Sequence, residues 1–453
     1  MFQRTAILHF RSSGVGNLRV SRIINRAFST SIFRMATDMS GSVPASVMPN
    51  ETVYRPRYID IGINLADPIF RGQYHGTQRH PDDLSAVISR AREVGCHKLI
   101  ITGSDFTSSR HALEIAREYP GTVYTTAGIH PCSSSIFSTT HSHVDTNGHT
   151  MPCDPDPSQP IPEDHEPDAE RTASIISELR TLIEETRSSS TGPSPLVAFG
   201  EFGLDYDRLH YCSKKIQLHS FAAQLDLALS LQPQLPLFLH SRAAHADFVG
   251  LLKEKFGPRL EKLERGAVVH SFTGTAEEMR ELMDLGLYIG TNGCSFKTAE
   301  NCAVVKEIHL DRLMLETDGP WCEVRPSHEG WKYLIEPPKP APSADISTAE
   351  NGATNNAGVT SNGTPSEQAQ QQQPRKGKQQ QSKKPQKKEP EVPERWNTVK
   401  KEKWVEGAMV KGRNEPCMIE RVGKIVAGIK GVTLEEVCEA AWRNTTKVFP
   451  VDE

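Results

Sequence analysis

Short apolar runs alternate with amphipathic stretches along most of this chain, beginning at Tyr58. The runs are rich in β-branched residues, which is typical of strands buried on both faces, and the amphipathic stretches have helical spacing. The predicted strands are Tyr58–Ile63, Lys98–Thr102, Val123–Ala127, Leu196–Gly200, Leu237–Leu239, Ala267–His270, Leu287–Gly290 and Leu313–Glu316. The predicted helices are Asp82–Val94, Ser108–Glu118, Thr172–Glu185, Lys214–Leu231, Ala246–Phe256, Ala276–Asp284, Ala299–Glu307, Asn414–Ala427 and Thr433–Thr446. This order predicts an α/β protein with a parallel sheet.

The number of alternations favours a closed (β/α)8 TIM barrel over an open doubly wound sheet. No Gly-rich dinucleotide fingerprint follows the first strand, which argues further against a Rossmann fold. The barrel is predicted to occupy residues 55–336 and 395–450 of the 453-residue chain, with the last two helices closing it.

Two polar segments interrupt the pattern. Residues 132–170 form a polar insertion rich in Ser, His, Asp and Pro, and residues 337–394 become first Gln-rich and then basic. The second segment cannot bury enough apolar surface to offset its ordering entropy, so it is predicted to be a disordered, low-complexity insertion. Its basic cluster fits a DNA-tethering arm or a nuclear-import signal, although such runs are more often simply solvated.

The first 50 residues are also predicted to be disordered. They contain six arginines and several serines, and no acidic residue precedes Asp38. This composition is typical of a mitochondrial transit peptide, whereas a start at Met35 or Met39 would give a cytosolic form. The expected location is therefore mitochondrial or cytoplasmic, depending on the start codon, and nuclear if the basic segment acts as an import signal.

Composition narrows the class of partner. The net charge of −4 excludes a chain-wide basic field, so a polyanionic substrate would be received by local basic groups or metal ions. The nine cysteines are scattered without a CxxC pair, which argues against a zinc knuckle or a disulfide scaffold. No apolar run approaches the ~20 residues that cross a bilayer. No membrane partner is expected, and the sequence implies no obligate protein partner.

Ionisable residues terminate four of the predicted strands. Glu201 follows the fourth strand, His240 the fifth and Asp318 the eighth, and His270 ends the sixth. In a parallel barrel the carboxyl ends of the strands form one rim, where the active sites of barrel enzymes lie. Any one of these residues could be structural, as a hydrogen-bonded core histidine, a helix cap or a turn residue. Two imidazoles and two carboxylates on one rim suit a divalent-metal hydrolase.

Seven motifs resemble, in order along the chain, the signature set of TatD-type deoxyribonucleases. They are Asp60–Phe70, Gly128–Pro131, Gly200–Tyr206, Leu239–Arg242, His270–Gly274, Glu316–Trp321 and Arg413–Pro416. The likeness runs from about Tyr58 to Phe449, apart from the two polar segments. It implies a TIM barrel of the amidohydrolase-like superfamily and magnesium-dependent hydrolysis of DNA phosphodiester bonds, often 3′→5′ on single strands.

The resemblance also implies which residues bind metal. It assigns two ions, expected to be Mg2+ with Mn2+ or Zn2+ as alternatives, to Glu201, His240, His270 and Asp318. Glu201 would bridge the ions, the two histidines would bind one of them, and Asp318 would bind the other. Many relatives carry a His-x-His pair at the end of the first strand, where this chain has Gly62 and Asn64. Asn64 would add a carbonyl ligand or order a water, and an oxygen-rich site suits magnesium.

Further roles follow from residue type and position on the same rim. Asp318 and Glu201 are the expected catalytic residues, with Asp318 orienting the attacking water and accepting its proton. His130 and Arg242 are expected to contact phosphate. Trp321 is expected to stack on an unpaired base, although a packed rim aromatic fits the sequence equally well. The motif Arg413–Pro416 is expected to support the rim.

Two other functions remain open from the sequence. One is a metal hydrolase of a different ester or amide bond, such as an aminoacyl bond, because one fold hosts many reactions. The other is a catalytically weak barrel that binds nucleic acid, which the missing histidine pair and the basic segment would fit. The intact set of four rim residues favours an enzyme.

Overall fold

The computed structural model describes residues 54–140, 158, 160–189, 192–335 and 392–451. The predicted targeting segment and nearly all of the basic insertion lie outside these ranges. Tyr54–Glu453 is one compact unit.

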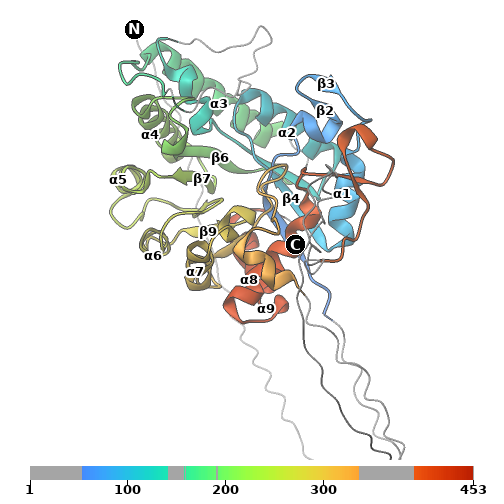
Figure 1. The fold of residues 1–453 in the computed structure, drawn as a ribbon. Helices are drawn as coiled ribbons and strands as arrows, with labels where there is room; N and C mark the ends of the chain where they lie inside the picture. The colour runs from blue at the N-terminus through green and yellow to red at the C-terminus, as the bar shows by residue number, and fades with distance from the viewer. Residues whose placement is uncertain (1–53, 141–157, 159, 190–191, 336–391, 452–453) are drawn as a thin grey trace, which may run out of the picture. The chain divides into compact units, whose positions relative to one another are not determined.

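Eight parallel strands form one sheet (Figure 1). They are β1 (Tyr58–Ile63), β4 (Cys96–Ile101), β5 (Val123–Ala127), β6 (Leu196–Asp205), β7 (Leu237–Arg242), β8 (Ala267–Val269), β9 (Tyr288–Thr291) and β10 (Leu313–Leu315), in that order across the sheet. The chain after β10 closes the sheet onto β1, because the Asp318 amide donates to the Gly62 carbonyl at 2.8 Å and the Asn64 amide to the Gly319 carbonyl at 2.9 Å. The predicted (β/α)8 barrel is confirmed.

The helices lie outside the strands (Figure 1). They are α1 (Leu84–Glu93), α2 (Phe106–Glu118), α3 (Ala169–Ser189), α4 (Lys214–Ser230), α5 (His245–Phe256), α6 (Ala276–Asp284), α7 (Ala299–Glu307), α8 (Ile419–Lys430) and α9 (Leu434–Val448). Side-chain caps fix several starts: Asp105 begins α2, Thr275 begins α6 and Thr433 begins α9, each in a capping box. No helix in the described ranges is long and apolar enough to cross a membrane.

Buried side chains form two clusters. The larger one packs the helices against the outside of the sheet and includes Phe199, Phe221 and Phe248. The smaller one draws on all eight strands, as the filled interior of a barrel does, and includes Phe238 and Phe449. The interior is therefore packed, and chemistry is confined to the rim.

The structure differs from the sequence prediction at two strands of the rim. β6 and β7 run on to Asp205 and Arg242, past the polar residues at which their apolar runs end. They continue because the two strands stay paired in this region, with Gly203 opposite His240. Glu201 and His240 therefore lie within paired strands, whereas His270 and Asp318 follow the ends of β8 and β10.

Smaller elements were not predicted. Residues 131–137, at the edge of the predicted polar insertion, form a 3-10 helix, and two short strand pairs join Gln73–Tyr74 to Thr77–Gln78 and Thr398–Val399 to Met409–Val410. Helix α8 begins at Ile419 rather than Asn414, because Arg413 and Glu415 are buried and engaged with α1. This contact supports the rim from the side of β1.

Candidate metal centre

Glu201 reaches the rim because β6 lies very close to β7 at this point. Glycines on both sides of Glu201 permit the approach: a Cβ on Gly200 would lie 2.1 Å from the Phe238 carbonyl oxygen, and one on Gly203 would lie 1.9 Å from that of His240. Both glycines also have a positive φ, a backbone conformation that residues with a Cβ rarely adopt. The Gly-Glu-Phe-Gly pattern thus places the carboxylate of Glu201 beside the imidazole of His240.

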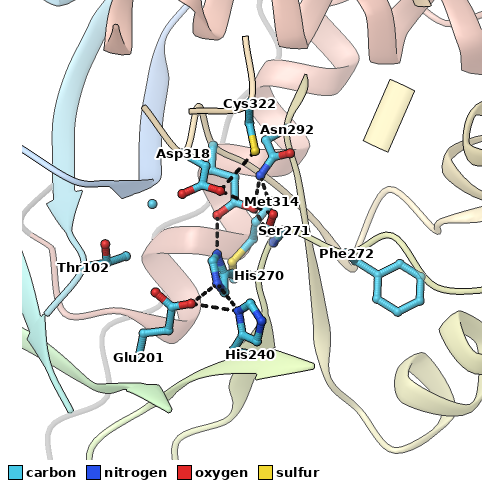
Figure 2. Close-up of polar contacts among 12 residues, drawn as sticks. Thr102, Glu201, His240, His270, Ser271, Phe272, Asn292, Met314, Asp318 and Cys322 are labelled. Atoms are coloured by element: carbon cyan, nitrogen blue, oxygen red, sulfur yellow. Dashed lines mark hydrogen bonds and ion pairs between the residues drawn. The ribbon is translucent and has the colours of Figure 1, made fainter. Parts of the chain in front are cut away.

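Two histidines meet one oxygen of Glu201 (Figure 2). Glu201 Oε1 lies 2.9 Å from His240 Nδ1 and 2.6 Å from His270 Nε2, and these two nitrogens are 3.3 Å apart. All three residues are buried. One carboxylate oxygen and two imidazole nitrogens converging in this way form a donor set suited to a divalent metal ion.

The other nitrogen of each histidine faces a second carboxylate. His240 Nε2 lies 3.1 Å from Asp205 Oδ2, and His270 Nδ1 lies 3.4 Å from Glu316 Oε2. A carboxylate on the far nitrogen fixes the tautomer and leaves the near nitrogen as a lone-pair donor, the usual arrangement around metal-binding histidines. The donor set and its surroundings therefore fit a resident metal ion.

The electrostatics of the centre point the same way. Burial opposes ionisation of Glu201, but His270 and His130 outweigh it and hold the pKa of that carboxyl well below its usual value. The pKa of His270 is raised well above its usual value, because the carboxylates of Glu201 and Glu316 outweigh burial. The carboxylates of the centre thus favour positive charge on the histidines, and a divalent cation placed among these groups would satisfy the same attraction.

Asp318 sits on the opposite side of the centre and is held by donors on both oxygens. Asn64 Nδ2 donates to Oδ1 at 3.1 Å, and the Cys322 thiol and the Ser271 hydroxyl approach Oδ2 at 3.2 Å and 3.5 Å. Burial raises the pKa of the Asp318 carboxyl, with Glu316 and Glu201 adding to the effect and His270 opposing it. Asn64 Nδ2 also donates to the Gly319 carbonyl, and Asn64 Oδ1 accepts from the Thr102 hydroxyl. Both ends of the Asn64 amide are therefore already bonded to protein groups, one of which is Asp318.

His130 joins the centre from the loop after β5. Its Nε2 lies 3.3 Å from Glu201 Oε1, and its atoms complete a potential metal-binding group with Glu201 and His240. The Cys132 amide donates to His130 Nδ1 at 3.1 Å. In the neutral ring this bond leaves the proton on Nε2, which makes His130 a hydrogen-bond donor rather than a lone-pair ligand.

Arg242 and Trp321 stand at the edge of the same rim. Arg242 interacts with the charges of Asp205 and Asp318, and its buried Nε has no hydrogen-bond partner among the residues described. Trp321 is 56% exposed, so it is a projecting aromatic rather than a packed one. Its backbone amide bonds to the Asp318 carbonyl at 3.1 Å, which ties it to the centre.

All eight residues singled out in the sequence lie around this rim. The sequence prediction missed two carboxylates that face the histidines: Asp205, which is hydrogen-bonded to His240, and Glu316, which lies at ion-pair distance from His270. Asp205 lies in the motif Gly200–Tyr206 and Glu316 in the motif Glu316–Trp321. The sequence pattern does not indicate that they lie beside histidines that are 35 and 46 residues away along the chain.

Fold and site together define the class: a metal-dependent hydrolase built on a barrel. Residues 59–356 match the family model described as TatD related DNase. "Deoxyribonuclease Tat-D" of Schizosaccharomyces pombe is 38% identical, with coverage of 87% of this chain and 96% of the relative. "3'-5' ssDNA/RNA exonuclease TatD" of Erwinia tasmaniensis is 34% identical, covering 58% of this chain and 79% of the relative. The chain belongs to the TatD-related DNase family, which confirms the resemblance.

Solved structures agree with the fold. The structure titled an uncharacterized amidohydrolase from Saccharomyces cerevisiae is 30% identical, has a TM-score of 0.63, and covers 87% of this chain and all of its own. A TatD family hydrolase from Entamoeba histolytica is 26% identical with a TM-score of 0.62 and covers 88% of this chain and 99% of its own.

Proposed function

We propose that this protein is a magnesium-dependent deoxyribonuclease that shortens single-stranded DNA from the 3′ end. The observation that carries the proposal is the convergence of Glu201, His240 and His270 beside Asp318 on the rim of a TatD-family barrel. The names of the relatives from Schizosaccharomyces and Erwinia support DNA as the substrate, and the bacterial name supports single strands and the 3′→5′ direction.

Glu201, His240 and His270 would hold one ion, and Glu201 with Asp318 would hold a second. A divalent ion bound there lowers the pKa of a bound water and neutralises charge that develops on the phosphoryl oxygens. Magnesium suits the second position because its ligands are oxygens and it retains several waters. Asn64 would fix the orientation of Asp318 through the bond to Oδ1.

The protein groups then divide the remaining work. Asp318 orients the attacking water and accepts its proton, since its carboxylate interacts electrostatically with His270 and Glu201 and its Oδ2 accepts from the Cys322 thiol at 3.2 Å and the Ser271 hydroxyl at 3.5 Å. His130 donates from Nε2 to a phosphate oxygen, and Arg242, whose buried Nε has no hydrogen-bond partner among the described residues, offers its guanidinium to the same group. Trp321 stacks on the unpaired base next to the scissile bond.

Hydrolysis of end-labelled oligonucleotides tests the proposal. Single-stranded DNA labelled at the 3′ or the 5′ end is incubated with the parent protein or Glu201→Ala, in magnesium or in EDTA. Stepwise shortening from the 3′ end that requires both magnesium and Glu201 is expected. An RNA oligonucleotide of the same sequence measures the sugar preference. No cleavage by folded, metal-loaded parent protein would refute the nuclease and leave hydrolysis of another ester or amide, or nucleic-acid binding by a catalytically weak barrel.

Asp318→Asn separates catalysis from binding. Loss of the carboxylate removes the proton acceptor while the amide keeps the shape of the side chain, so we expect hydrolysis to cease and DNA affinity to stay within a few-fold. Anisotropy of a labelled oligonucleotide measures the affinity. Turnover equal to that of the parent protein would exclude Asp318 from the reaction.

A further inference from the structure

Two cysteines from separate rim loops meet beside the metal centre. Cys294 lies in the 3-10 helix Gly293–Phe296 after β9, and Cys322 lies four residues beyond Asp318. Both are free thiols, and their sulfur atoms are 2.6 Å apart. A contact of this kind between residues 28 positions apart requires that the fold itself bring the two loops together.

The backbone around the pair is built for close approach. A Cβ on Gly293 would lie 1.9 Å from the Cys322 carbonyl oxygen, so glycine is needed next to Cys294. The side chain of Asn292 accepts from the Cys294 amide at 2.8 Å and donates to the Ser271 hydroxyl at 2.9 Å. The Asn292 bonds hold the Cys294 loop against Ser271, and the close approach of Gly293 to the Cys322 carbonyl gives the backbone proximity that a disulfide bond demands.

The pair is connected to the site and to solvent. Cys322 is partly exposed, next to the projecting Trp321, whereas Cys294 is 8% exposed. Figure 2 shows the Cys322 sulfur directed at Asp318, and the thiol donates to Asp318 Oδ2 at 3.2 Å. Arg242 interacts electrostatically with both thiols and with Asp318. A change at the sulfur atoms therefore reaches the groups that handle water and phosphate.

We propose that Cys294 and Cys322 form a reversible disulfide that lowers the turnover of the enzyme. The oxidant is a small disulfide. The sulfur of Cys322 attacks one sulfur of the oxidant, whose S–S bond breaks to give a mixed disulfide and one thiol. The sulfur of Cys294 then attacks Cys322, releasing the second thiol. Two protein thiols lose two electrons and two protons, and the oxidant gains both as two thiols. A dithiol reductant reverses the exchange.

Oxidation changes the surroundings of Asp318. The Cys322 sulfur loses its hydrogen and can no longer donate to Oδ2, which among the described residues keeps only the Ser271 hydroxyl at 3.5 Å. Loss of one hydrogen bond of ordinary strength corresponds to about threefold to tenfold in turnover. This effect on turnover rests on the proposed nuclease function, whereas formation of the disulfide does not.

Peptide mapping of the full chain tests the disulfide directly. The protein is equilibrated with oxidised lipoic acid, a cyclic disulfide, and the remaining thiols are then alkylated before digestion and mass spectrometry. We expect a linked pair of peptides containing Cys294 and Cys322, lighter by two hydrogen atoms, that separates after dithiothreitol. If both cysteines are recovered as alkylated thiols instead, the proposed disulfide is wrong.

Turnover measured on the same samples tests the regulation. The oxidised parent is expected to hydrolyse single-stranded DNA about threefold to tenfold more slowly than the reduced one, with full recovery in dithiothreitol. Cys294→Ser should hydrolyse DNA at the same rate with and without the oxidant. Without Cys294 to complete the protein disulfide, the free thiol of the opened cyclic oxidant closes its ring again and releases Cys322. Cys302→Ser, equally buried at 7% exposed, should respond like the parent.

The outcomes separate the two proposals. A disulfide that forms without changing turnover would refute the regulation, and loss of turnover in oxidised Cys294→Ser would assign the effect to another thiol. If reduced parent protein shows no nuclease activity, the proposed function fails, while the peptide map still decides whether the disulfide exists.

Discussion

Asp205→Asn tests how much the carboxylate of Asp205 contributes to metal binding through its hydrogen bond to His240. Asp205 is 2% exposed, and its Oδ2 accepts from His240 Nε2 at 3.1 Å while its Oδ1 accepts from the Asp207 amide at 3.1 Å. In the asparagine variant the amide oxygen would keep the bond to the Asp207 amide, which directs the NH2 group at His240. Two donors then face each other, so His240 must move its proton to Nδ1 and lose the lone pair directed at the metal.

The structure sets the size of the effect. The bond that is lost joins a buried charged acceptor to an imidazole, and such bonds contribute about 1.5–3 kcal/mol. Removing an outer partner of a metal-binding histidine typically costs about 10–100-fold in metal affinity or activity, which is ~1.4–2.7 kcal/mol. The two ranges agree, so we expect turnover at fixed magnesium to fall by about one to two orders of magnitude.

Magnesium titration of hydrolysis, with calorimetric measurement of metal binding, provides the assay. Asp207→Asn is the matched control, because Asp207 lies in the same turn, is exposed and makes no described side-chain contact with His240. That variant should titrate like the parent. If Asp205→Asn also titrates like the parent, Asp205 does not orient His240, and Nδ1 is not the nitrogen that faces the metal.

Three further outcomes are expected. Burial raises the pKa of the Asp60 carboxyl to about 8, so the folded protein holds a proton that the unfolded chain releases near pH 4. The stabilisation by the Asp60 proton is fully present below pH 4 and is lost as the pH rises to 8, at about 1.4 kcal/mol per pH unit. Urea unfolding at pH 5, 6.5 and 8 should show this slope for the parent and not for Asp60→Asn. Trp321→Ala should weaken binding of single-stranded DNA by about fivefold to 100-fold in anisotropy, without changing the melting temperature; unchanged affinity would exclude stacking. Magnesium at about 100 times its dissociation constant should raise the melting temperature of the parent by a few degrees, reversibly in EDTA, and His270→Gln should abolish this shift. A shift that persists in the variant would place the ion elsewhere.

The barrel could be predicted because the strands are mostly apolar runs that alternate with helical stretches, and Glu201, His240, His270 and Asp318 stood out because they end or follow those runs. The same signal placed the ends of β6 and β7 too early, since a polar residue inside a paired strand looks like a strand end. The contacts of Asp205 and Glu316 were hidden for a different reason. They depend on side-chain direction across neighbouring strands, which hydrophobic periodicity does not encode.

Gly62 stands where many relatives carry a histidine, and Glu316 lies beside it. Adding a methyl group at position 62 tests whether Glu316 needs that space. A Cβ on Gly62 would lie 2.5 Å from Glu316 Oε2 and 3.4 Å from Phe238 Cζ. Glu316 is fully buried, and its Oε1 accepts from the Ser271 amide and from Asn292 Nδ2, so it has little room to withdraw. In this chain the carboxylate thus fills space that a side chain at position 62 would need.

Gly62→Ala should therefore displace Glu316 and release His270, whose Nδ1 depends on that carboxylate. Overpacking of this kind costs about 1–3 kcal/mol of stability, and loss of the outer partner should lower activity by about 10-fold or more. Gly250→Ala on α5, where an added Cβ has open space, should be neutral or more stable by up to ~1 kcal/mol. If Gly62→Ala melts and hydrolyses DNA like the parent, Glu316 moves freely and does not position His270. If the stability and the activity of Gly62→Ala both fall, Glu316 positions His270, and Gly62 leaves the space that Glu316 needs in order to do so.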